Sequence, residues 1–202
     1  MVNTMFTIGI TGGTGAGKTS ALRAAGTLGA LVLDCDAIYH ELLSGNAELK
    51  AELEERFSGV LHDGKIDRKK LGEIVFGEPS ALLDLNKITH KYISGELERR
   101  IRDWEEQGGT VVAIDAIALL ESGRGGKCDV TVGVVAPVET RIARIMKRDG
   151  ISLEQAEKRI NAQKPESFYR ENCDHILEGK YDSSAEFEEV CREFFSGILT
   201  NL

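Results

Sequence analysis

The chain has 202 residues, 42% of them hydrophobic, and a formal net charge of −8 at pH 7. This length suits one α/β domain, in which roughly 70% of the surface of the unfolded chain can be buried. The acidic balance argues against a nucleic-acid-binding protein, which normally presents a broad basic surface. No apolar run approaches the length of a membrane span, and no basic region precedes an apolar stretch near the start. We therefore expect a cytoplasmic protein without nucleic-acid or membrane partners.

The first thirty residues predict a strand, a glycine-rich loop and a helix. Residues 5–10 are apolar and β-branched, whereas residues 19–28 are rich in Ala and Leu. Between them, residues 12–19 have the spacing GxxxxGK[ST]. Glycines let backbone N–H groups turn inward around an anion, Lys18 can reach the β and γ phosphates, and the Thr19 hydroxyl can ligate Mg²⁺. The order of these elements places a helix N-terminus at the phosphates, so we expect a nucleoside triphosphate here; the alternative is an ordinary glycine-rich turn.

Two aspartates follow the second predicted strand, residues 30–33, and precede a predicted helix over residues 37–43. Ligands of doubly wound sheets gather at the carboxyl ends of the strands, so we expect Asp34 and Asp36 at the same edge as the glycine loop. Asp36 can either cap the following helix or accept a proton from a substrate hydroxyl. Taken alone, capping is the more common role at such a turn. For Asp34 we expect a structural role at the strand end.

Residues 46–107 are charged and helical in pattern, with no strand candidate, which predicts a helical insertion. Within it, Asp67 is expected to cap a helix, with Ile66 and Leu71 placed as a hydrophobic staple. A longer amphipathic helix is predicted over residues 81–107.

Three more strands and a terminal helix are predicted after the insertion. The strands cover residues 110–114, 129–135 and 175–177, and the helix covers residues 182–199. Asp115 ends the first of these strands and resembles a carboxylate that holds Mg²⁺ through water. A purely structural role of Asp115 at the strand end is the alternative.

A cluster of basic residues occurs on one predicted helix. Arg141, Arg144 and Arg148 have the spacing i, i+3, i+7 and form one basic stripe, which in an acidic chain suggests an anionic ligand. After a turn, Ser152 and Gln155 form a capping box that opens a second helix. A helical hairpin with such arginines is typical of the lid that closes over ATP in small kinases. The alternative is a solvated basic face.

Together these motifs resemble the dephospho-CoA kinase family over nearly the whole chain. The resemblance implies an α/β fold, namely a P-loop kinase with a central parallel five-stranded sheet flanked by helices, a helical acceptor-binding insertion and a helical lid. It implies a single P-loop kinase domain over residues 1–202. The shared segments are residues 9–20, 33–38, 63–68, 85–90, 119–123 and 144–163. Within the domain, the nucleotide-binding core is expected at residues 1–35, 111–140 and 164–202, the acceptor-binding region at 36–110 and the lid at 141–163.

The resemblance also implies a reaction. The γ-phosphoryl group of ATP, a co-substrate bound with Mg²⁺, is transferred to the ribose 3′-hydroxyl of dephospho-CoA, giving coenzyme A and ADP, and we expect a monomer. Asp36 matches the base of the family, which reverses the preference for capping. Catalytic roles are implied for Asp36, Lys18, Arg144 and Arg148, and acceptor-binding roles for Asp36, Arg68 and His90. The metal is expected at Thr19, with Asp115 through water. The residues expected to bind ATP are Gly12, Gly13, Thr14, Gly15, Ala16, Gly17, Lys18, Thr19, Ser20 and Arg144.

The chain departs from the usual family pattern at His40, Lys91, Ile117 and Gly179. These departures concern the acceptor side and the adenine edge rather than the glycine loop. Two other functions stay open, namely another P-loop nucleoside monophosphate or small-molecule kinase, and a non-catalytic ATP-dependent switch. A GTPase would need an NKxD motif, and residues 86–89 lack its aspartate.

Overall fold

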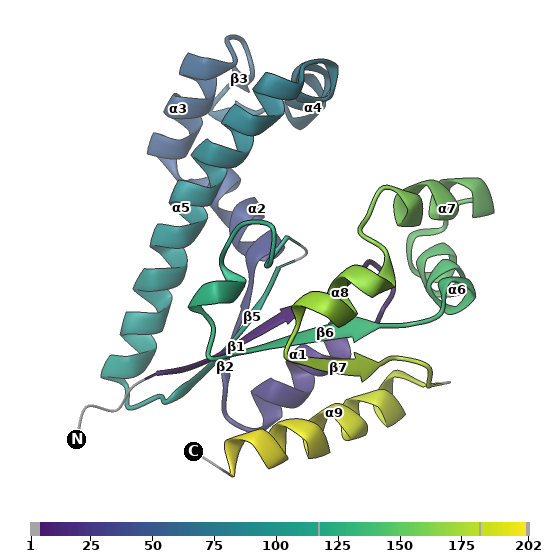
Figure 1. Ribbon diagram of the computed structural model, residues 1–202. Coiled ribbons are helices and arrows are strands. Elements are labelled where there is room, and N and C mark those ends of the chain that lie inside the picture. Colours follow the sequence, from purple (N-terminus) through teal and green to yellow (C-terminus); the bar gives the residue numbers. More distant parts are fainter. Residues whose placement is uncertain (1–4, 117, 182, 201–202) are drawn as a thin grey trace. The chain divides into compact units, whose positions relative to one another are not determined.

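The computed structural model describes residues 5–116, 118–181 and 183–200. The chain divides into two compact units, shown as ribbons in Figure 1. Unit 1 comprises Met1–Leu33 and Trp104–Leu202, and unit 2 comprises Asp34–Asp103. Among the described residues, no helix is both long and apolar enough to cross a membrane.

Unit 1 is built on the five-stranded sheet that the sequence predicts, with strand order β2-β5-β1-β6-β7. The pairings of β1 with β5, of β1 with β6 and of β6 with β7 are parallel. The fifth strand, β7, is confirmed. The strands are β1 (Phe6–Thr11), β2 (Leu31–Asp34), β5 (Val111–Asp115), β6 (Val130–Val135) and β7 (His175–Glu178).

Helices cover both faces of this sheet. In β1, Ile8 and Ile10 are fully buried in the core cluster that α1 and α9 contribute to, so their side chains point to one face. Side chains alternate along a strand, and a Cβ on Gly133 of β6 would meet Tyr169 of α8 on the other face. The helices of unit 1 are α1 (Lys18–Thr27), α6 (Val138–Asp149), α7 (Leu153–Asn161), α8 (Glu166–Asn172) and α9 (Ser184–Leu199), with a 3₁₀ turn η1 at Gly125–Lys127.

The sequence predicts α9 and the capping box of α7, and the structure confirms both, except that Asp182, the expected first residue of α9, lies outside the described residues. The short helix α8 has no counterpart in the sequence prediction.

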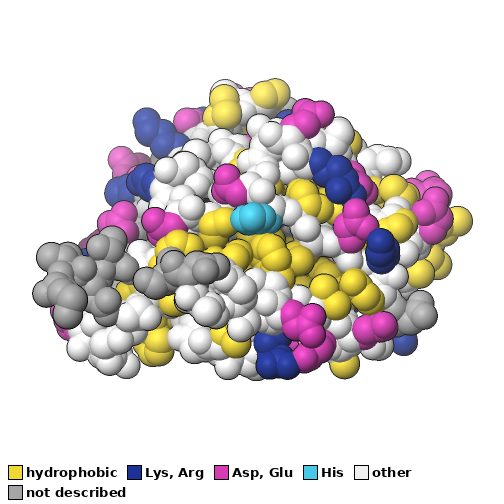
Figure 2. All heavy atoms as spheres, turned by 60° about the horizontal axis from the view of Figure 1, so that its bottom comes forward, with side chains coloured by type: hydrophobic (Ala, Val, Ile, Leu, Met, Phe, Trp, Pro, Cys, Tyr) yellow, Lys and Arg dark blue, Asp and Glu magenta, His cyan; other side chains and the backbone are white. Residues whose placement is uncertain are grey.

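Hydrophobic side chains also gather at the surface of unit 1. Figure 2 turns forward the side that carries α9 at the bottom of Figure 1, and a band of hydrophobic side chains lies there beside one histidine. Partly buried residues such as Phe6, Phe194 and Ile198 pack against the core cluster. The rings of His175 and Phe194 meet edge to face at 5.3 Å. These residues extend the core to the surface.

Unit 2 is mainly helical, and its expected helix cap is confirmed. The Asp67 carboxylate accepts hydrogen bonds from the backbone N–H groups of Lys69 and Lys70, at 3.0 Å each. The core of the unit includes Leu49, Leu53 and Leu97, all fully buried. The helices are α2 (Cys35–Gly45), α3 (Ala47–Arg56), α4 (Arg68–Gly77) and α5 (Pro79–Glu106), the last of which continues into unit 1.

The prediction of an insertion without strands is wrong. Two-residue strands, β3 (Leu61–His62) and β4 (Lys65–Ile66), pair in an antiparallel hairpin. Its turn is Asp63-Gly64, and both residues have positive φ, 47° and 74°. An Asp-Gly pair with positive φ at both positions is the preferred two-residue hairpin turn. The strands are too short to show an alternating pattern in the sequence.

The contrast between a buried and an exposed leucine tests this core. Leu53 is fully buried, whereas Leu83 of α5 is 69% exposed. We expect Leu53→Ala to lower the free energy of unfolding by about 2 to 5 kcal/mol, because it removes buried methyl groups and leaves a cavity. The matched variant Leu83→Ala should change it by less than about 0.5 kcal/mol. Urea titration followed by circular dichroism measures both, and equal losses would contradict the assigned core.

Candidate active site

The P-loop, residues 12–19, joins β1 to α1 in unit 1. Gly12 and Gly17 have φ of 143° and 117°, in the region that favours glycine. Gly17 is the N-cap of α1, so the free N–H groups of the helix start at this loop. The Lys18 ammonium donates a 2.9 Å hydrogen bond to the Gly12 carbonyl, which brings the cation back across the loop. Glycines of positive φ, a helix N-terminus and a lysine are the components of an anion-binding site.

Close packing also requires glycine in this loop. A Cβ on Gly12 would lie 2.2 Å from the Val134 carbonyl oxygen of β6. A Cβ on Gly17 would lie 2.7 Å from the ring of Phe187 in α9. The loop therefore lies directly on the central sheet and on the last helix.

Oxygen ligands suitable for Mg²⁺ lie at the same end of the sheet. Thr19 is exposed in the first turn of α1, and Asp115 is the last residue of β5. Asp115 is in register with Ile10 of β1, two residues before Gly12. A hydroxyl and a carboxylate are the hard oxygen donors that Mg²⁺ prefers. Ser20, by contrast, is buried, and its hydroxyl donates to the Ser184 carbonyl at 3.3 Å, which joins α1 to α9.

The structure brings Arg144 of α6 to the P-loop. One guanidinium nitrogen, Nη1, donates to the carbonyls of Gly15 and Ala16 at 3.2 and 3.3 Å. The other, Nη2, donates to the Tyr181 carbonyl at 3.0 Å, beyond β7. Burial lowers the pKa of this guanidinium from its usual value. Arg144 thus holds the loop to the segment between β7 and α9.

Arg148, also of α6, takes part in an ion-pair cluster. Its guanidinium pairs with the Asp149 carboxylate at 2.7 Å, and Arg159 of α7 pairs with the same carboxylate at 2.6 Å. The Arg148 hydrogen bond is the main cause that holds the pKa of Asp149 at about 2. Arg148 also reaches the Thr14 hydroxyl at 3.4 Å. Asp149 therefore links the two helices of the hairpin while Arg148 points to the P-loop.

Two further residues contact the P-loop through partners that the sequence does not predict. Arg141 is only 6% exposed, and its Nε donates to the Thr14 carbonyl at 2.9 Å. The side-chain oxygen of Gln163 accepts from the Thr14 N–H and from Arg141, both at 2.9 Å. The sequence shows Arg141 in the basic stripe of α6, but no spacing rule relates it to Gln163 or to Thr14.

Gly179, one of the departures from the family pattern, lies against the P-loop. Its N–H donates to the Val135 carbonyl at 2.7 Å, which extends the pairing of β7 with β6. A Cβ at this position would lie 2.2 Å from the Ala16 carbonyl oxygen. The backbone here leaves no room for a side chain.

In unit 2, the two aspartates have different structural roles. Asp34 is the N-cap of α2, and its Oδ1 accepts from the N–H groups of Asp36 and Ala37 at 2.9 and 3.0 Å. The structural role expected for Asp34 is confirmed. Asp36 lies in the first turn of α2 and is exposed. The capping alternative for Asp36 is wrong, because Asp34 already fills that role.

The two other expected acceptor-binding residues also lie in unit 2. Arg68 begins α4, and its charge acts on the hydroxyl of Tyr39: burial raises the pKa of Tyr39, and Arg68 opposes that rise. Tyr39 follows Asp36 by three residues on α2 and shares its helix face. His90 is exposed on α5. Among the contacts of the described residues, none links His90 to Asp36 or to Arg68.

The remaining departures lie mostly in unit 2. The Lys91 ammonium pairs with the Glu52 carboxylate at 2.8 Å, and Tyr92 donates to the same carboxylate at 2.7 Å. Lys91 therefore helps to join α5 to α3. His40 packs its ring against Tyr39, with 5.7 Å between the centroids. Ile117 lies outside the described residues.

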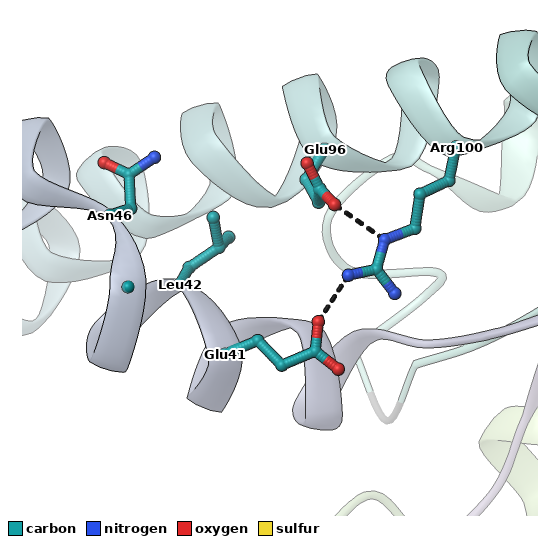
Figure 3. A pocket seen from close by; sticks show the side chains of 6 residues that line it. Glu41, Leu42, Asn46, Glu96 and Arg100 are labelled. Carbon is teal, nitrogen blue, oxygen red and sulfur yellow. Dashed lines mark hydrogen bonds and ion pairs between the residues drawn. The ribbon is translucent and has the colours of Figure 1, made fainter.

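Unit 2 also has a pocket of about 260 Å³ between α2 and α5 (Figure 3). Arg100 of α5 extends toward α2, pairs with Glu41 and donates to Glu96 at 2.7 Å. The hydrogen bond from Arg99 is the main cause that lowers the pKa of Glu96 to about 2, with Arg100 contributing. The charged groups that line this pocket, Glu41, Glu96 and Arg100, are already paired with one another.

A five-stranded parallel sheet that carries a P-loop at the carboxyl end of its central strand defines the class of P-loop nucleotide-binding proteins, to which the P-loop kinases belong. A family model for dephospho-CoA kinase matches residues 6–184. The dephospho-CoA kinase of Corynebacterium jeikeium is 33% identical over 198 residues, covering 96% of this chain and 100% of the relative. The chain therefore belongs to the dephospho-CoA kinase family, and the resemblance seen in the sequence is confirmed.

Solved structures agree with this assignment. A protein of Thermus thermophilus superposes with a TM-score of 0.82 at 30% identity, covering 98% of each chain. A dephospho-CoA kinase of Campylobacter jejuni superposes with a TM-score of 0.60 at 26% identity, covering 95% of this chain and 96% of the other. The P-loop kinase fold and the class of enzyme, an ATP-dependent phosphotransferase, are therefore as the sequence predicts.

The contact between Gly179 and Ala16 generates a prediction. We expect Gly179→Ala to raise the KM for ATP by about tenfold or more, because the added methyl group must displace the P-loop at Ala16. The control is Gly126→Ala in η1, where an added Cβ meets nothing within 4 Å. Steady-state kinetics with ATP as the varied substrate measures both variants. An unchanged KM in Gly179→Ala would show that the loop tolerates the displacement.

Proposed function

We propose that the residues of this dephospho-CoA kinase divide the reaction between a phosphate-binding side in unit 1 and an acceptor side in unit 2. The γ-phosphoryl group of ATP passes to the ribose 3′-hydroxyl of dephospho-CoA, and coenzyme A and ADP are released. The single observation that carries this assignment is the P-loop, with its glycine conformations and the Lys18 ammonium drawn across it.

The P-loop amides and Lys18 bind the phosphates of ATP in this proposal. Phosphoryl transfer has a loose transition state with charge spread over the equatorial oxygens, so catalysis consists mainly of positioning and charge neutralisation. Arg148 supplies positive charge from the α6–α7 hairpin, which acts as the lid over ATP. Its ion pair with Asp149 is exposed to solvent, which screens such pairs, so Arg148 can exchange this carboxylate for a phosphate.

Asp36 acts as the proton acceptor for the ribose hydroxyl. Two observations support this role: Asp34 is the N-cap and already accepts from two free N–H groups of α2, and Asp36 is exposed. A late proton transfer in a loose transition state does not require a raised pKa. Arg68 and Tyr39 lie on the acceptor side, where Arg68 binds an anionic part of dephospho-CoA. His90 is assigned to the same side from the family resemblance.

Mg²⁺ fits the donor set at the end of the sheet. Thr19 would hold it directly and Asp115 through water, both with the hard oxygen atoms that this ion prefers. When bound, Mg²⁺ neutralises charge on the β and γ phosphates of ATP. A monomeric state, a cytoplasmic location and the lack of nucleic-acid and membrane partners remain predictions from composition and family resemblance.

The proton acceptor can be tested by Asp36→Asn. We expect kcat to fall by about 10²- to 10⁴-fold, because the amide cannot accept the proton, while the affinity for ATP stays unchanged. ADP release coupled to dephospho-CoA measures the rate, and a fluorescent ATP analogue measures binding. Undiminished turnover would remove Asp36 from this role. Equal ADP release with and without dephospho-CoA, or with a nucleoside monophosphate in its place, would overturn the proposed reaction.

The metal site can be tested by Thr19→Val, which replaces the hydroxyl with a methyl group of similar shape. We expect the Mg²⁺ concentration for half-maximal activity to rise by about tenfold or more. Substitution of residues that support a metal site typically lowers metal affinity by about this factor. Thr27→Val, at the other end of α1, is the matched control, because its hydroxyl donates only to the Ala24 carbonyl. If both variants respond alike to Mg²⁺, Thr19 is not a ligand.

A further inference from the structure

Arg141 is a buried cation with specific partners. Among the described residues, Arg141 is the one charged residue that is buried, with 6% of its surface exposed. Burying a charge costs free energy unless hydrogen bonds compensate for lost water. Arg141 makes two such bonds at 2.9 Å, one to the Thr14 carbonyl and one to the Gln163 side chain. A buried guanidinium of this kind needs an explanation beyond the solvated basic face of α6.

Gln163 completes a closed set of contacts around Thr14. Its Oε1 accepts from Arg141 and, at 2.9 Å, from the Thr14 N–H. The N–H and the C=O of Thr14 are therefore both held, the first by Gln163 and the second by Arg141. The guanidinium also lies against the bare backbone of Gly13, where a Cβ would come within 2.3 Å of Nη2.

The direction of these bonds matters for the anion site. The C=O of Thr14 and the N–H of Gly15 belong to one trans peptide unit, in which the two groups point to opposite sides. Because the Thr14 carbonyl points to Arg141 of α6, the Gly15 N–H must point away from this helix. Gln163 fixes the preceding peptide unit through the Thr14 N–H in the same way.

The two residues also come from the two ends of the α6–α7 hairpin. Arg141 lies in the first turn of α6, and Gln163 follows the C-cap residue of α7, Ala162. The base of the hairpin is thus fastened at one residue of the P-loop. Any movement of the hairpin relative to the loop would have to strain or break this set of bonds.

We infer that Arg141 and Gln163 are positioning residues, which clamp the peptide units on either side of Thr14 and so direct the Gly15 N–H toward the phosphates of bound ATP. This rests on the proposed binding of ATP phosphates by the P-loop. Neither side chain touches the reacting atoms. Their effect is on the shape of the site and on the coupling of the hairpin to the loop.

The chemistry of the contacts supplies a sharp test. Gln163 uses one oxygen as the acceptor of both bonds, so Gln163→Glu keeps both and Gln163→Leu loses both. We expect Gln163→Leu to raise the KM for ATP by about tenfold, which corresponds to about 1.4 kcal/mol. The KM for dephospho-CoA should stay within about twofold, and Gln163→Glu should restore the KM for ATP to nearly its original value. A Glu variant as impaired as the Leu variant would overturn the inference, as would a Leu variant with unchanged kinetics.

A double-mutant cycle tests Arg141. Arg141→Lys keeps the charge but loses the fork that reaches two acceptors, so the KM for ATP should rise in this variant too. Because both residues act on Thr14, the combined Arg141→Lys and Gln163→Leu variant should lose less than the product of the two single effects. Independent effects that multiply would contradict a shared clamp. Gln107→Leu makes the same substitution at an exposed position just after α5 and is the matched control.

Failure of this inference can be told apart from failure of the proposed function. Lys18→Ala removes the cation of the P-loop without touching the clamp. If Lys18→Ala leaves ATP binding unchanged, the phosphate site itself is wrong. If Lys18→Ala abolishes binding while Gln163→Leu has no effect, the phosphate site stands and the clamp is rejected.

Discussion

The backbone conformation of the P-loop is the constraint on which the rest of unit 1 depends. The loop has positive φ at Gly12 and Gly17, and its backbone lies so close to its neighbours that a side chain would overlap the Val134 carbonyl or the Phe187 ring. The strand β6 and the terminal helix α9 therefore pack directly against the backbone of the loop. A chain that binds phosphate in this way needs the whole sheet and its last helix, not only the glycine motif.

The arginines of α6 show how one basic stripe can serve two purposes. Arg141 and Arg144 donate to backbone carbonyls of the P-loop and of the segment after β7, whereas Arg148 pairs with an exposed carboxylate. Buried donors fix the loop because leaving them unpaired would cost about 1 to 3 kcal/mol each. Separating an exposed ion pair costs less free energy, because water solvates both charges. Burial thus decreases along α6 from Arg141 to Arg148, and the residues that hold the loop are the more buried ones.

Local rules explain which features the sequence predicts. The P-loop spacing, the Asp67 cap and the Ser152–Gln155 capping box each depend on residues a few positions apart, and all are found in the structure. The β3–β4 hairpin was missed because two-residue strands have no period, although its Asp-Gly turn was a usable signal. The contacts of Thr14 with Arg141 and Gln163 join residues 127 and 149 positions apart, and only tertiary packing brings them together.

The spacing of Asp34 and Asp36 acquires a physical meaning from the structure. A helix that begins at the end of a strand leaves N–H groups without partners, and the nearest carboxylate is drawn to them. Asp34 satisfies these groups with one oxygen, so the second aspartate keeps its side chain exposed in the first turn of α2. If Asp36 is the proton acceptor, as we propose, a single aspartate would have to serve both as the cap and in the reaction. Two aspartates two residues apart separate these two roles, because Asp34 is the N-cap and leaves the Asp36 carboxylate available.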